Sequence, residues 1–155
     1  MQSKDRDLLG KAKDYAFLLL KFRPRSEKEL CQRLKNKKFD DRTIRETITF
    51  LKDKAFLDDF SFARAWIESR LKKPFGLRRI RQELKLKGID EEIISSRIAA
   101  AKEGYSEEEI VRKIAKEKFN KIRNLETDKA KRRIFSYLIR RGFSSDTVAD
   151  IVKQL

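Results

Sequence analysis

The sequence predicts an all-α fold, built as an elongated array of three tandem three-helix repeats with about nine helices. Apolar residues recur three or four positions apart along most of the chain, as on one face of a helix. No segment alternates for long between apolar and polar residues, and no Asn-Gly or Asp-Gly hairpin turn occurs. A pattern of helix starts and apolar pairs returns after 50 and again after 54 residues, which indicates a helical repeat protein.

The first predicted helix covers residues 4–22, and its apolar run 16–20 faces a core. Pro24 ends it, because a proline pushes the preceding residue out of the helical region. Ser26 and Glu29 then have the spacing of a capping box, in which each side chain accepts a hydrogen bond from the other residue's backbone. The second helix therefore starts at Ser26 and runs to about residue 37.

The third helix of the first repeat starts at Asp40, a residue type that caps helix N-termini. Phe39 and Ile44 stand on either side of this cap at the positions of a hydrophobic staple. Ile48 continues the apolar spacing. The turn before this helix contains Lys38, so we expect a turn that does not need a left-handed glycine.

The same features recur in two further repeats, which predicts domains over residues 1–58, 59–104 and 105–155. Pro74 and Asp90 repeat Pro24 and Asp40, and Ser106 with Glu109 opens the third repeat with another capping box, on a helix to about residue 120. Ser144 or Ser145 caps the last helix. The predicted buried positions of the second helices and the staples are Leu30, Leu34, Phe39, Ile80, Leu84, Ile89, Ile134, Leu138 and Phe143.

The chain is strongly basic, with 40 Lys and Arg against 25 Asp and Glu, a net charge of +15 and a pI of about 10.0. Residues 1–61, 62–104 and 105–155 each carry +5, so the charge belongs to the whole body. Such an excess favours a polyanionic partner, nucleic acid before a membrane surface. The longest apolar run, residues 15–20, is too short to cross a membrane.

Catalysis and metal binding are not expected, so we predict a non-enzyme without cofactor or metal. The chain has no His, which excludes an imidazole base and His-based metal sites, and five scattered Gly give no phosphate-binding loop. A single Cys can form neither a zinc cluster nor an internal disulfide, and this favours a reducing compartment. We therefore expect a cytoplasmic protein, and a monomer.

Three stretches carry a resemblance to one known family. The middle one reads LDDFSFARAWI from Leu57, then RRIRQEL from Arg78 and GID from Gly88. The first reads RPRSEKEL from Arg23, and the last reads KRRI from Lys131 and LIRRGF from Leu138. Over roughly residues 14 to 155 they resemble the core signature, the start of the first unit and the third unit of the RecX family, which usually has Gly at the position of Lys38.

The resemblance implies a negative regulator of the RecA recombinase, with roles in recombination and the SOS response. Members of the family bind the RecA filament on single-stranded DNA, lie in its helical groove and limit ATP hydrolysis, strand exchange and co-protease activity. The implied partners are the RecA filament and single-stranded DNA, with double-stranded DNA a further candidate. A basic, elongated, non-catalytic body is compatible with this role.

The predicted contact surface lies on the second helix of each repeat. If Ile80 and Leu84 face the core, then Arg78, Arg81 and Lys85 share the opposite face, at about 100° per residue. The basic residues predicted to contact a partner or DNA are Lys28, Lys35, Arg78, Arg79, Arg81, Lys85, Lys87, Arg132, Arg133, Arg140 and Arg141. A solvated face without a partner is the plainer interpretation of such a stripe.

Three smaller predictions concern apolar and thiol side chains. Phe135 and Ile139 are either buried on the first helix of their repeat or exposed as an apolar docking patch. Phe62 and Trp66 are predicted in the core, although aromatic residues between arginines can also stack on bases. Cys31 is expected to be a partly buried apolar residue with no reactive role.

A non-sequence-specific DNA-binding protein is the alternative function. Three-helix units can present a helix to a DNA groove, and the affinity would then fall steeply with salt. Base readout usually adds Asn or Gln to Arg. Gln82 is the one such residue in the Arg-rich helix, which argues against sequence-specific readout.

Overall fold

The structure, a computed structural model, describes residues 2–155 and contains nine helices and no strand within that range. This confirms the all-α tandem repeat. No helix in this part of the chain combines the length and the apolar character that crossing a bilayer requires. The helices are α1 Ser3–Phe22, α2 Glu27–Asn36, α3 Asp41–Asp53, α4 Asp59–Leu71, α5 Leu77–Leu86, α6 Glu91–Ala101, α7 Glu107–Lys121, α8 Thr127–Arg140 and α9 Ser145–Lys153.

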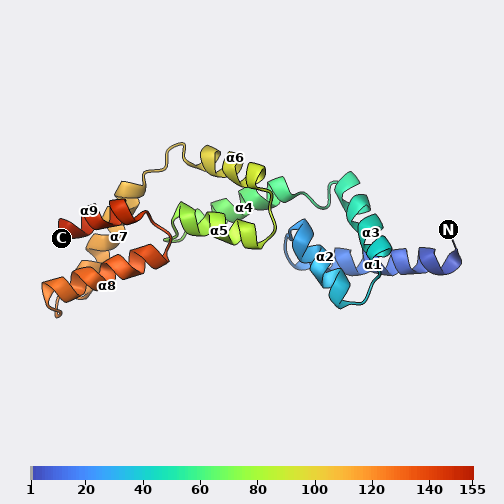
Figure 1. Cartoon of the computed structure of the whole chain (residues 1–155), viewed down its shortest axis with the longest axis horizontal. Helices are drawn as coiled ribbons and strands as arrows, with labels where there is room; N and C mark the ends of the chain where they lie inside the picture. The colour runs from blue at the N-terminus through green and yellow to red at the C-terminus, as the bar shows by residue number, and fades with distance from the viewer. Residues whose placement is uncertain (1) are drawn as a thin grey trace.

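Three three-helix domains lie in a row, with the N-terminus at one end of the molecule and the C-terminus at the other (Figure 1). In each domain the first and third helices pack together, and the second helix packs against both. The domains have separate cores, because each buries its own apolar cluster. The elongated outline follows from this arrangement.

The predicted core pairs of the second helices are buried in all three domains. Leu30 with Leu34, Ile80 with Leu84, and Ile134 with Leu138 are each at most 1% exposed. Fully burying such a side chain contributes about 1.5–3 kcal/mol, so these pairs anchor each second helix in its domain. Phe143 is buried too, while Phe39 is half-buried against the first core.

Two of the predicted helix caps are confirmed in full. Ser26 and Glu29 form the reciprocal capping box of α2, and the Asp40 carboxylate accepts a hydrogen bond from the Thr43 N–H at 2.8 Å. Ser106 accepts from the Glu109 N–H at 3.3 Å, which is one of the two bonds of a capping box. These caps satisfy backbone donors that a helix start leaves unpaired.

The remaining caps differ from the prediction. Asp90 and Ser144 occupy the N-cap positions of α6 and α9, but neither side chain makes a capping hydrogen bond. At Ser144, the backbone N–H instead donates to the Glu107 carboxylate of α7, so a neighbouring helix holds this helix start. Glu107 thus binds the backbone N–H that the N3 carboxylate binds in a capping box, while the Ser144 side chain leaves its own capping bond unmade.

The turns that follow the second helices all use the left-handed region. Gly88 and Gly142 have φ values of 77° and 91°, and Lys38 adopts 69° at the equivalent position. The first turn therefore does without glycine, as expected, yet keeps the left-handed conformation. A non-glycine residue there carries a conformational cost of about 1–2 kcal/mol.

The second helices α2, α5 and α8 lie along one side of the row, joined end to end (Figure 1). The Ser26 hydroxyl at the start of α2 donates to the Lys87 carbonyl at the end of α5, at 2.6 Å. The Gly76 N–H at the start of α5 donates to the Arg141 carbonyl at the end of α8, at 2.7 Å. At both domain junctions a donor at the start of one second helix thus meets a carbonyl at the end of another, through a hydroxyl in the first junction and a backbone N–H in the second.

Charged side chains reinforce the first junction. Glu29 accepts from the Arg23 guanidinium at 3.0 and 3.2 Å and from the Ser26 N–H at 3.2 Å, and it pairs with Lys87 of the next domain. Burial alone would raise the pKa of Glu29, but the bonds from Arg23, Lys87 and Ser26 outweigh it and lower the pKa to about 2. The ionised carboxylate thus links the first two domains.

Removing the charge of the Glu29 carboxylate is expected to lower the free energy of unfolding by an amount that depends on pH. Because the folded pKa lies below the usual value, the stabilisation is present above about pH 5 and is lost as the pH falls toward 2. Glu29→Gln should lower the free energy of unfolding by about 2 kcal/mol at pH 7, after allowance for partly exposed partners. Urea unfolding at pH 7 and at pH 3 measures the difference, which should shrink at the lower pH.

The control is Glu46→Gln, which removes the exposed partner of Arg42 within α3. Exposed pairs of this kind contribute about 0.3–0.5 kcal/mol. A Glu29→Gln effect no larger than the control, or one that does not change with pH, would contradict the assigned role.

Candidate partner-binding surface

The exposed face of α5 carries the basic stripe that the sequence predicts. Ile80 and Leu84 are buried, and residues on the opposite side of this helix turn must then face outward. A shallow hollow of about 400 Å³ on this face is lined by Arg78, Arg81, Gln82, Lys85 and Leu86. The three basic residues of the predicted stripe therefore share one surface.

This stripe is partly neutralised from within the protein. Arg81 and Lys85 both pair with Glu91 at the start of α6, Lys85 at 3.5 Å. The Glu91 side chain is 55% exposed, and exposed ion pairs contribute little to stability. An anionic group of a partner can thus displace Glu91 at small cost. Arg78 is exposed and belongs to none of the ion pairs among residues 2–155.

A groove of about 460 Å³ continues this face across the boundary between the second and third domains. It brings together Arg78 and Arg79 of α5 with Ile139 and Arg140 of α8. The sequence did not predict Leu86, which is 73% exposed and also lines the groove. The groove combines cations with apolar side chains that bury surface when a protein docks.

An aromatic and arginine cluster fixes the walls of this groove. The buried ring of Phe75 has the guanidinium groups of Arg79, Arg141 and Arg70 at 4.4, 4.8 and 4.9 Å from its centre. Glu83 accepts from Arg70 at 2.8 Å and from Arg79 at 3.2 Å. These cation–π contacts and ion pairs join side chains of both domains and hold the groove in one geometry.

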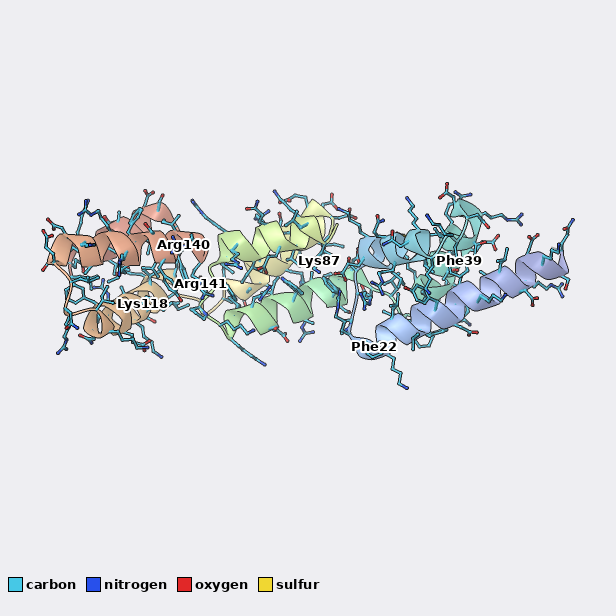
Figure 2. All side chains as sticks on the ribbon, turned by 90° about the horizontal axis from the view of Figure 1, so that it is seen from below. Phe22, Phe39, Lys87, Lys118, Arg140 and Arg141 are labelled. Atoms are coloured by element: carbon cyan, nitrogen blue, oxygen red, sulfur yellow. The ribbon has the colours of Figure 1, made fainter. Side chains whose placement is uncertain are left out.

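The other predicted basic residues have different surroundings. Lys87 and Arg141 lie in the two junctions between domains (Figure 2). Lys87 pairs with Glu29, and its ammonium lies 5.1 Å from the Trp66 ring centre. Lys28 and Lys35 are exposed on α2. Arg132 and Arg133 lie in a second groove, between α7 and α8, and Arg140 borders both grooves.

The apolar predictions divide between core and surface. Phe135 is half-buried against the third core, whereas Ile139 is 36% exposed. Phe62 is buried, which confirms it as a core residue, and half-buried Trp66 packs against the edge of this core with its ring 5.8 Å from that of Phe62. Cys31 is half-buried as expected, and burial raises the pKa of its thiol. Within residues 2–155, no group of three or more His, Cys, Asp or Glu side chains is placed to hold a metal.

Comparisons with known proteins agree on one family. Models described as the first, second and third three-helix domains of RecX match residues 12–51, 58–96 and 106–152. A regulatory protein RecX of Clostridium acetobutylicum is 34% identical, with 98% of this chain and 71% of that protein covered. One from Haemophilus influenzae is 32% identical, with 91% and 92% covered.

Solved structures share the fold. A crystal structure of RecX from Lactobacillus salivarius superposes with a TM-score of 0.80 at 23% identity, and 97% of each chain is covered. A second crystal structure, of regulatory protein RecX, gives a TM-score of 0.79 at 23% identity over 98% of this chain and 74% of the other. The row of three helical domains is therefore the architecture of these proteins as well.

Proposed function

Because the chain belongs to the RecX family of regulatory proteins, we propose that it is a negative regulator of the RecA recombinase. In this proposal it binds the RecA filament on single-stranded DNA, in the cytoplasm and as a monomer. It lies in the filament groove and limits ATP hydrolysis, strand exchange and co-protease activity. The chain acts by contact, with no reaction of its own.

Family membership carries this proposal, and the groove between the second and third domains supports a protein partner. Leu86 and Ile139 offer apolar area there, and Arg78 and Arg140 offer charge beside it. Interface centres commonly combine apolar anchors with arginine, which supports a protein partner rather than DNA alone. The elongated row allows contacts with more than one protomer of a filament (Figure 1).

A non-sequence-specific DNA-binding protein stays the second candidate, because the net charge of +15 favours any polyanion. The two functions separate in a RecA assay. We expect the protein to inhibit the ATPase activity that RecA shows on single-stranded DNA, also when that DNA is in large excess. Inhibition that vanishes with excess DNA would favour DNA sequestration, and no inhibition would overturn the proposal.

The groove itself is tested by the double variant Arg78→Ala with Leu86→Ala. Both side chains are exposed, so the fold should be unaffected, and truncating two interface anchors costs roughly 1–2 kcal/mol each. We expect at least a tenfold higher concentration for half-inhibition of the RecA ATPase. The control is Arg64→Ala, which removes an exposed arginine of α4 that pairs with Glu68. This variant should inhibit the RecA ATPase at the same concentration as the wild type. Equal inhibition by the double variant and the control would exclude this groove.

A further inference from the structure

The groove between α7 and α8 has a volume of about 860 Å³, and basic side chains surround it. Lys118 and Lys121 come from α7 and the other cations from α8, and no acidic residue is part of the lining. Figure 2 shows Lys118 and Arg140 on the two helices that border the groove. The cations that line it are Lys118, Lys121, Lys129, Arg132, Arg133 and Arg140.

Among residues 2–155, none of these six cations forms an ion pair with a carboxylate. An ion pair elsewhere in the third domain joins Arg112 to Glu108 within α7. A separate hollow there collects Glu108, Asp146 and Asp150. Three acidic residues of the domain thus gather outside the groove, whose own lining carries only positive charge. Clefts lined by one sign of charge concentrate counter-ions of the opposite sign.

The arrangement of the cations indicates a chain of phosphates. Lys129 and Arg140 are 11 residues apart on α8, a span of about 16.5 Å at 1.5 Å per residue, which is longer than the triphosphate group of a nucleotide. Guanidinium groups bind phosphate oxygens in pairs of hydrogen bonds. Successive phosphodiesters along an extended strand can therefore meet successive side chains of the groove.

The size of the groove suits one strand. Its volume lies within the range of about 300–1,000 Å³ that small-ligand pockets occupy, so a single extended backbone can enter it, whereas a whole duplex could only lie across its rim. One aromatic ring, Tyr137, lies in the lining, with the Lys118 ammonium 3.7 Å from its centre and the Arg141 guanidinium at 5.0 Å. These contacts hold two cations in place at the side of the groove.

We propose that the α7–α8 groove of the third domain binds the phosphate backbone of single-stranded nucleic acid. The α5 face and the groove beside it are then left for the protein partner, and the two surfaces meet at Arg140. The assignment rests on the proposed function only for the identity of the strand, which would be the one inside the RecA filament. Binding to the bare strand does not require RecA.

The test is binding of a fluorescent oligo(dT), about 15 nucleotides long, over a series of salt concentrations without RecA. The variant carries Lys121→Gln, Arg132→Gln and Arg133→Gln, three exposed residues of the lining. Single strands give a slope of log affinity against log salt of about −0.7 per phosphate neutralised. We expect the slope to become less steep by about 2 and the affinity to fall at least tenfold.

The matched control removes the same charge elsewhere, with Lys102→Gln, Lys113→Gln and Lys116→Gln at exposed positions outside the lining. Its affinity should stay within twofold of the wild type. Equal losses in both variants would mean that only net charge matters, and would overturn the proposal. Displacement of the oligonucleotide by ATP, or by polyglutamate at equal charge, would assign the groove to a nucleotide or an acidic protein instead.

Failure of this proposal is distinguishable from failure of the proposed function. If the groove variant loses oligonucleotide affinity while inhibition of RecA disappears only in the Arg78→Ala, Leu86→Ala variant, the two surfaces have separate partners. If oligonucleotide binding is unchanged in the groove variant, the α7–α8 groove is not the nucleic-acid site, whether or not the protein inhibits the RecA ATPase.

Discussion

Gly142→Ala is expected to lower the free energy of unfolding by about 3–4 kcal/mol, because the new methyl group would meet a backbone and a side chain that cannot both move. Gly142 has a φ of 91°, which costs an L-residue about 1–2 kcal/mol. Its added Cβ would lie 2.4 Å from the Arg79 Cβ and 2.6 Å from the Arg79 nitrogen, and such overpacking costs typically 1–3 kcal/mol. Urea unfolding followed by circular dichroism measures the sum.

Two other glycines separate these contributions. Gly104 has a φ of 71° but no atom within 4 Å of an added Cβ, so Gly104→Ala should cost only the backbone strain. Gly10 lies inside α1 with open space around it, and Gly10→Ala should stabilise the protein by about 1 kcal/mol. If Gly142→Ala cost no more than Gly104→Ala, the second junction would have to open without loss, contrary to the close contact described.

Glu83→Ala is expected to cost about 3 kcal/mol, because one carboxylate holds three donors. Its oxygens accept from the Trp66 indole N–H at 2.9 Å and from Arg70 and Arg79, and its side chain is only 16% exposed. Removing it leaves a half-buried indole donor and two arginines without their partner, and breaking buried pairs costs about 3–5 kcal/mol. Partial exposure of the arginines places the expected value at the lower end.

Intrinsic fluorescence gives a second readout, since Trp66 is the one tryptophan of the chain. Loss of the hydrogen bond to Glu83 should change its emission in the folded protein, before any denaturant is added. Glu68→Ala, which removes the exposed partner of Arg64, is the control and should leave both stability and emission nearly unchanged. Identical emission from Glu83→Ala and the wild type would contradict the indole contact.

Local chemistry explains why so much of the fold could be predicted. Ser26 and Asp40 cap helices through atoms three residues away, so their spacing in the sequence contains the whole interaction. The buried pairs, such as Ile80 with Leu84, follow from helical periodicity in the same way. Where a distant residue intervenes, as Glu107 does at Ser144, the local rule gave the right helix start but the wrong hydrogen bond.

The candidate surfaces could be predicted only in part, because they depend on contacts between separate elements. The helical wheel placed Arg78, Arg81 and Lys85 together, but it could not show that Glu91 of the next helix pairs with two of them. Leu86 gains its place beside Ile139 only through the second junction. The same holds for the α7–α8 groove, whose two walls are brought together by packing of the third domain.

The end-to-end arrangement of α2, α5 and α8 has an electrostatic consequence of its own. Aligned peptide dipoles leave about half a positive charge at a helix N-terminus and half a negative charge at a C-terminus. At each junction the N-terminus of one helix adjoins the C-terminus of the next, so the opposite partial charges attract across the domain boundary. This attraction originates in the main chain, and no single side-chain substitution can remove it. Variants such as Glu29→Gln should therefore loosen the row of domains without separating it.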